Sequence, residues 1–140
     1  MSAIESVMTA NPAACTPETP IRQVAQLMID NDCGQIPVVD AGGKPLGVVT
    51  DRDIAVRLVA TGKAGATAGD AMSSPCQFVA AASKVQVAIK LMESAKIRRV
   101  PVVDGDGRLF GIVSIADLAL AGKQEATAQV VKQVSEPGAK

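Results

Sequence analysis

The chain has 140 residues but no histidine, tryptophan or tyrosine, and only two phenylalanines. Without histidine it lacks the most common general base and the Ser-His and Cys-His pairs that activate nucleophiles. A zinc site would have to be completed by carboxylates. Cys15, Cys33 and Cys76 stand at unrelated spacings, and we interpret them as reduced thiols in or near the interior. The sequence therefore predicts no catalytic residues, no metal site and no enzymatic activity.

Excess charge and long apolar runs are also missing. Fourteen acidic and fourteen basic residues give a formal net charge of zero, without the positive balance that phosphate-driven binding of nucleic acids needs. The shortage of aromatic side chains removes the platform on which single-stranded bases stack. No apolar run approaches the roughly 20 residues that span a bilayer, and the first residues do not resemble a signal peptide. We predict a cytoplasmic protein that binds neither nucleic acid nor membrane.

What the sequence does contain is an internal repeat with a constant offset of 64 residues, the distance from Met8 to Met72. The same offset aligns Pro37 with Pro101. Such a repeat is typical of two copies of one supersecondary unit. Because two copies cannot form an extended array, we predict a pseudo-symmetric pair packed through their sheets, with two similar sites in the clefts between them.

Each copy reads as strand, helix, strand, strand, helix, which predicts an α/β (α+β) fold class. A helix capped by Thr19 is expected to run to about Asn31. Ser83 and Gln86 match a capping box at the start of its counterpart. Two short β-branched runs on either side of a turn predict a hairpin in each copy. The expected strands are residues 14–16, 36–40, 46–49, 100–104 and 110–113, and the expected closing helices are residues 51–61 and 115–121.

These elements place the first copy at residues 1–63 and the second at residues 71–122, with an Ala/Gly-rich linker at residues 64–70. Residues 123–140 lie outside the repeat. Within them, the apolar side chains of residues 125–134 share one face of a predicted helix. This helical tail either covers exposed core at the end of the module or docks a partner or a second copy.

The most informative motif occurs once in each copy, from Gly47 to Asp53 and from Gly111 to Asp117. It consists of glycine, two aliphatic residues, Ser or Thr, any two residues and aspartate. Because a strand leads directly into a helix, the hydroxyl is expected at the N-cap and the aspartate in the first turn. There a carboxylate can accept two sugar hydroxyls, and free backbone N–H groups can meet a phosphate. The alternative is an ordinary capping box, but two copies in the same context favour a ligand site.

With these motifs the chain resembles a tandem pair of cystathionine-β-synthase (CBS) domains, the adenosine-ligand-binding regulatory unit called a Bateman module. The resemblance covers about residues 5–121. It is carried by residues 36–40 and 99–104 together with the two glycine-to-aspartate motifs. It implies that Asp53 and Asp117 hold the ribose diol of the ligand and that Thr50 and Ser114 lie by its phosphate.

The resemblance also places the residues just before the Pro-led strand in the pocket. There Arg98 and Arg99 are expected to approach phosphates, and the alternative is that they are solvated surface charge. The first copy has Gly34 and Gln35 at this place, which carry no charge. The expected adenine contacts are the backbone and aliphatic groups around Cys33, Gly34, Ile97 and Val100.

We therefore predict a stand-alone regulatory module that binds an adenosine-containing ligand and passes the signal on by a conformational shift. AMP, ADP, ATP, NAD, S-adenosylmethionine and cyclic dinucleotides all fit the resemblance. The nucleotide is a regulatory ligand, and no cofactor is expected. The resemblance implies a homodimer, and an unidentified protein partner is a second route for the signal. The alternative function is a non-enzymatic interaction scaffold that keeps the fold and binds little or no ligand.

Overall fold

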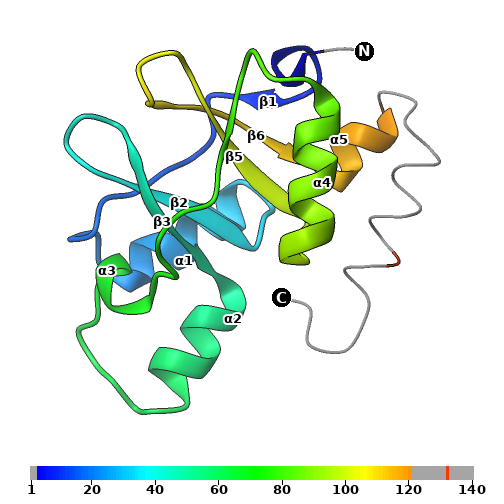
Figure 1. The fold of residues 1–140 in the computed structure, drawn as a ribbon. Coiled ribbons are helices and arrows are strands. Elements are labelled where there is room, and N and C mark those ends of the chain that lie inside the picture. Colours follow the sequence, from blue (N-terminus) through cyan, green and yellow to red (C-terminus); the bar gives the residue numbers. More distant parts are fainter. Residues whose placement is uncertain (1–2, 121–131, 133–140) are drawn as a thin grey trace. The chain divides into compact units, whose positions relative to one another are not determined.

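The computed structural model describes residues 3–120 and residue 132, and it shows an α+β fold with two compact units (Figure 1). One unit comprises Ala13–Gln77, and we name it the Asp53 unit after the motif aspartate that it contains. The other joins Met1–Pro12 to Phe78–Lys140, and we name it the Asp117 unit for the same reason. The predicted fold class is confirmed.

The Asp117 unit contains a four-stranded sheet in the order β1 (Thr9–Ala10), β6 (Leu109–Ser114), β5 (Arg99–Val103) and β4 (Val79–Ala80). The predicted hairpin is β5 with β6, and β4 joins β5 in parallel. Helices α4 (Val85–Ala95) and α5 (Ile115–Leu120) lie beside β5 and β6 in Figure 1, and the turn η1 (Ile4–Ser6) precedes β1. All of these elements except β1 contribute to one core, formed by Ile4, Val79, Ala81, Val85, Ala88, Ile89, Met92, Val100, Val102, Val113 and Leu118.

The Asp53 unit repeats this arrangement with shorter strand pairings. Its elements are α1 (Ile21–Asp30), β2 (Gln35–Val39), β3 (Pro45–Thr50), α2 (Asp51–Asp53), the π-helical η2 (Ile54–Val59) and α3 (Ala68–Ala71). The predicted hairpin is β2 with β3. Single bridges join Cys15 to Val38 and Val48 to Ser73. The repeat offset maps these bridges onto the β4–β5 and β1–β6 pairings, so both units have the same order of paired segments.

Two helix starts and one strand differ from the sequence prediction. Thr19 does not cap α1, because its hydroxyl accepts the N–H of Thr16 at 3.0 Å, and Pro20 takes the N-cap position. The capping box predicted at Ser83 is also absent, since α4 begins one residue later with Lys84 as its N-cap. The strand predicted at residues 14–16 is reduced to the single bridge at Cys15.

The N-terminal segments of the two sequence copies are exchanged between the units. Residues 3–12 belong to the first copy but pack in the Asp117 unit, and residues 71–77 open the second copy but pack in the Asp53 unit. Met8 lies against Gly111, and Met72 lies against Gly47. The packing units thus differ from the sequence copies. The boundaries predicted for the copies describe the repeat in the sequence, and they stay a prediction.

The segment predicted as a linker, residues 64–70, also contributes to the packing of the Asp53 unit. It includes most of α3, and Ala66, Ala68 and Ala71 are buried in the core of this unit. The N–H of Ala68 donates to the carbonyl of Thr19 at 2.8 Å. The segment is therefore a connection that is itself folded.

The helical tail predicted within residues 123–140 lies outside the described residues apart from residue 132, so its role stays a prediction. In the part of the chain that the structure describes, no helix has the length and apolar character needed to cross a bilayer.

Ile4 provides a direct test of the segment exchange. Its side chain is 0% exposed in the core of the Asp117 unit, and its N–H donates to the carbonyl of Ser83 at 2.8 Å. The substitution Ile4→Ala should destabilise the protein by about 2–5 kcal/mol, because it removes buried methyl groups and leaves a cavity. Amide hydrogen exchange followed by NMR should show the loss of protection mainly in β5 and β6.

The matched control is Val24→Ala, because Val24 is equally buried in the core of the Asp53 unit. This variant should lose protection mainly in β2 and β3. Identical patterns of lost protection for the two variants would contradict the assignment of residues 3–12 to the Asp117 unit.

Candidate functional site

Thr50 and Asp53 join the end of β3 to the start of α2. The hydroxyl of Thr50 accepts the N–H of Asp53 at 3.0 Å, and the N–H of Thr50 donates to Oδ2 of Asp53 at 3.0 Å. This reciprocal pair is a capping box, so the cap proposed as the alternative interpretation of the motif is present. The box uses Oδ2 and leaves Oδ1 outside it. The side chain of Asp53 is 12% exposed, so the backbone holds a carboxylate that solvent still reaches.

Ser114 and Asp117 form the same box where β6 meets α5. The N–H of Ser114 donates to Oδ2 of Asp117 at 2.9 Å, and the N–H of Asp117 donates to the hydroxyl of Ser114 at 3.1 Å. The strand passes into the helix without an intervening residue in both units. The two motifs are therefore equivalent in structure as well as in sequence.

A hydroxyl from the exchanged segment lies beside each motif aspartate. The hydroxyl of Ser73 lies 3.3 Å from both carboxylate oxygens of Asp53, and the hydroxyl of Thr9 donates to Oδ1 of Asp117 at 3.3 Å. Sequence reasoning missed both residues. The signal was present, because each follows one of the aligned methionines and both carry a hydroxyl. Each candidate site thus combines residues from both sequence copies.

Thr67 and Asp70 show what a similar cap looks like outside the motif. Oδ2 of Asp70 accepts the N–H of Thr67 at 2.9 Å, and Oδ1 pairs with Nζ of Lys63 at 3.2 Å. The N–H of Thr67, and then Lys63, hold the pKa of Asp70 below its usual value. These partners are local in sequence. A partner from an exchanged segment is therefore what distinguishes the two motif sites from this cap.

The two motif sites differ in the cation beside the carboxylate. Nε of Arg57 lies 3.8 Å from Oδ1 of Asp53. Nη1 of the same arginine donates to the carbonyls of Met72 at 2.8 Å and Ala71 at 3.3 Å. The repeat offset maps Arg57 onto Ala121, which carries no charge. Sequence reasoning missed this arginine, and its contacts with the exchanged segment follow from the tertiary structure alone.

Arg98 and Arg99 lie at the Ser114 end of the hairpin. Arg99 is the first residue of β5 and is the register partner of Ser114. The carbonyl of Arg98 accepts the N–H of Ile115 at 3.1 Å. Arg98 is exposed and Arg99 is half-buried. The fold thus brings the backbone of both arginines beside the capping box of the Asp117 unit.

The residues predicted to contact adenine differ in their burial and in their surroundings. The carbonyl of Gly34 accepts the N–H of Asp51 at 3.0 Å, and a Cβ at Gly34 would lie 2.8 Å from the carboxylate of Asp51. Cys33 and Ile97 are half-buried at equivalent positions against the cores of their units. Val100 is 0% exposed within the core of the Asp117 unit. Its side chain therefore packs in the core, and the adenine contacts around it stay a prediction.

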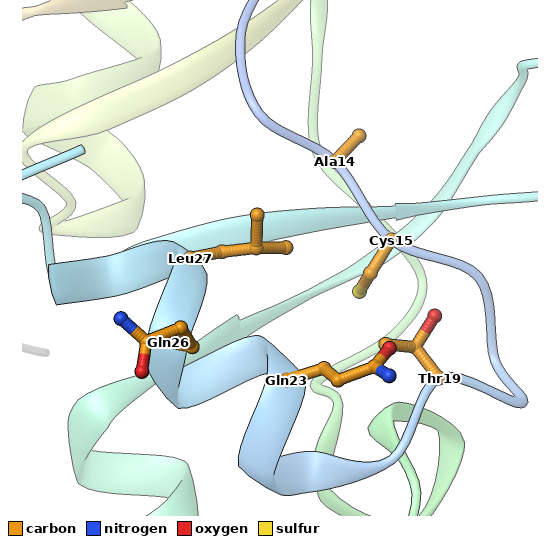
Figure 2. Close-up of a pocket in the computed structure, with 6 residues that line it drawn as sticks. All are labelled: Ala14, Cys15, Thr19, Gln23, Gln26 and Leu27. Atoms are coloured by element: carbon orange, nitrogen blue, oxygen red, sulfur yellow. The ribbon is translucent and has the colours of Figure 1, made fainter. Parts of the chain in front are cut away.

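A separate pocket of about 340 Å³ opens in the Asp53 unit between α1 and the segment before it (Figure 2). It is lined by Ala14, Cys15, Thr19, Gln23, Gln26 and Leu27, none of which belongs to the predicted ligand site. Burial raises the pKa of Cys15 from 9.0 to about 11 and that of Cys76 equally, so both thiols stay protonated near neutral pH. Among the described residues, no cluster of three or more His, Cys, Asp or Glu side chains is arranged to hold a metal ion.

Comparisons with known proteins match both copies of the repeat. The family model for the CBS domain matches residues 4–60 and 68–123. The chain is 38% identical over 121 residues to CBS domain-containing protein YhcV of Bacillus subtilis, across 86% of this chain and 85% of that protein.

Two solved structures with a similar fold contain adenosine-type molecules. The structure of CBSX2, a CBS-pair protein from Arabidopsis thaliana, in complex with AMP matches with a TM-score of 0.76 and 26% identity, over 89% of this chain and 98% of that chain. The CBS domain pair of protein MJ0100 in complex with 5′-methylthioadenosine and S-adenosyl-L-methionine matches with a TM-score of 0.78 and 25% identity, over the same shares of both chains.

Proposed function

Because this chain belongs to the CBS domain family and carries two copies of the domain, we propose that it is a regulatory module that binds an adenosine-containing ligand. We assign the ribose diol to Asp53 and Asp117. Thr50 and Ser114 lie by the phosphate in this proposal. A cleft between the two repeats, as the location of the ligand, stays a prediction.

The observation that carries this proposal is the shared geometry of the two motif aspartates. In each unit the backbone holds the carboxylate through Oδ2, while Oδ1 stays outside the capping box and faces a hydroxyl group. A carboxylate oxygen has lone pairs for more than one donor, so it can also accept the hydroxyls of a ribose diol. The ligands of CBSX2 and MJ0100 support the choice of adenosine, since each contains this nucleoside.

The proposal is regulatory and does not include catalysis. YhcV supports it, because the match spans 85% of a protein named only for its CBS domains. A ligand shifts an equilibrium only by its differential affinity for two states. We therefore propose that the output is a change in a homodimer or in the contact with a protein partner.

A binding screen with AMP, ADP, ATP, NAD and S-adenosylmethionine tests this function. A ligand at 100 times its dissociation constant should stabilise the protein by about 2.7 kcal/mol, which thermal unfolding detects readily. Isothermal titration calorimetry then measures the affinity and the number of sites. If none of these compounds binds at millimolar concentration, the interaction scaffold becomes the better account.

Arg98 and Arg99 predict a preference for phosphorylated ligands. Replacing both with Gln should weaken AMP or ATP about tenfold or more and leave adenosine nearly unchanged, because charge-assisted hydrogen bonds to phosphate are the stronger ones. Calorimetry with the three compounds measures this difference. The control is Arg108→Gln, an exposed arginine at the opposite end of the hairpin. Equal weakening of all three compounds would assign Arg98 and Arg99 to the fold and not to phosphate.

A further inference from the structure

We infer that Arg57 is a positioning residue that couples the Asp53 site to residues 71–73 of the exchanged segment, and that no described residue plays this part at the Asp117 site. The inference rests on the proposed function, because it concerns what ligand binding at Asp53 does to the rest of the chain. Three sets of contacts carry it: those of Arg57, those of Ser73 and those of Thr9 in the Asp117 unit.

Arg57 reaches across from η2 to the end of α3. The last carbonyls of a helix have no partner within the helix, and Nη1 of Arg57 satisfies two carbonyls there, those of Ala71 and Met72. The 2.8 Å contact with Met72 is a charge-assisted hydrogen bond. The side chain of Arg57 is 46% exposed, so solvent partly screens its 3.8 Å ion pair with Asp53. The ion pair therefore orients the arginine side chain more than it stabilises the fold.

Ser73 attaches the same segment to the strand that leads to the motif. Its N–H donates to the carbonyl of Val48 at 2.8 Å, and its carbonyl accepts the N–H of Val48 at 3.1 Å. Its hydroxyl lies 3.3 Å from the carboxylate of Asp53. Asp53, Arg57 and residues 71–73 therefore form one network of contacts. In it the carboxylate of Asp53 contacts both Arg57 and the hydroxyl of Ser73, which hold the segment in place.

A ribose diol that donates to Oδ1 of Asp53 would compete with Ser73 and Arg57 for this oxygen. Ser73 and Arg57 approach the same oxygen, whose capacity for donors is limited. Ligand binding should thus weaken the hold of Asp53 on the exchanged segment, and by linkage a loosened segment should favour the ligand. In the Asp117 unit, the hydroxyl of Thr9 donates to Oδ1, and no cation pairs with this oxygen among the described residues. In the sequence, the repeat offset aligns Arg57 with Ala121, which has no charge.

Amide hydrogen exchange of the free protein tests the positioning role. The variant Arg57→Gln should speed exchange of the Ser73 amide by about tenfold, because the segment loses a charge-assisted hydrogen bond. The amides of Thr9 and Ile112, which pair at the equivalent place, are the internal control and should not change. Arg57→Lys keeps the charge and offers the N–H donors of a single ammonium nitrogen, so it should restore part of the protection. Unchanged exchange at Ser73, or an equal change at Thr9, would overturn the positioning role.

Saturation with AMP tests the coupling. In the Asp117→Asn background, which isolates the Asp53 site, AMP should speed exchange of the Ser73 amide severalfold in the protein with Arg57 and should add nothing in Arg57→Gln. AMP binding with no effect at Ser73 would contradict the coupling and leave the proposed function intact. A failure of AMP to bind even before Asp117 is changed would count against the proposed function and remove the coupling with it.

Discussion

The double variant Asp53→Asn, Asp117→Asn should bind AMP about 10–100-fold more weakly than the unchanged protein. Each asparagine keeps a carbonyl oxygen that can accept the N–H that Thr50 or Ser114 now donates to Oδ2, so the cap survives in part. The negative charge is lost, and a hydrogen bond to a charged group contributes about 1.5–3 kcal/mol. The affinity of each site should therefore fall about 10–100-fold, as measured by calorimetry, with circular dichroism to confirm the fold.

Asp70→Asn is the matched control for this loss. Asp70 accepts the N–H of Thr67 much as the motif aspartates accept theirs, but its partners are local and it lies outside the motif. Its substitution should leave the affinity for AMP unchanged. If the double variant binds AMP normally while its unfolding temperature falls, Asp53 and Asp117 are caps only and their assignment to the ribose is wrong.

Gly47→Ala should destabilise the Asp53 unit although it adds only one methyl group. A Cβ at this position would lie 2.5 Å from the backbone carbonyl oxygen of Ser73 and 3.2 Å from Sδ of Met72. A backbone atom in a strand pairing cannot move aside as a side chain can, so the exchanged segment must be displaced. Overpacking of this kind costs about 1–3 kcal/mol, and the loss of the Val48–Ser73 bridge adds to it. Urea unfolding measures the free energy, and hydrogen exchange at Ser73 locates the damage.

Two other glycines calibrate this expectation. Gly105→Ala should be nearly neutral, because no atom beyond the adjacent residues lies within 4 Å of the position that its Cβ would take. Gly111→Ala should be costly, since its Cβ would meet the flexible side chain of Met8 and the carbonyl of Thr9, and Met8→Ala should relieve part of that cost. Equal stability of Gly47→Ala and Gly105→Ala would show that the exchanged segment does not pack as described.

The sequence by itself determined the elements that depend on neighbours along the chain. The hairpins follow from short β-branched runs around turns, and their pairing confirms the prediction. The boxes at Thr50 and Ser114 follow as well, because their partners lie only three residues away and a strand runs directly into a helix. The stripe of α4 buries Val85, Ala88, Ile89 and Met92, which stand at the spacing of one helical face.

Only the tertiary structure decided which segment completes each sheet and each site. Thr9 pairs with Ile112, and Ser73 pairs with Val48, across the boundary between the sequence copies. The repeat makes Val48 and Ile112 equivalent, so the pattern offers each N-terminal segment two similar strands and cannot choose between them. The choice depends on long-range packing, such as the burial of Ile4 in the core of the Asp117 unit. For the same reason the contacts of Arg57 with Met72, which connect positions 15 residues apart through a folded segment, could not be read from local spacing.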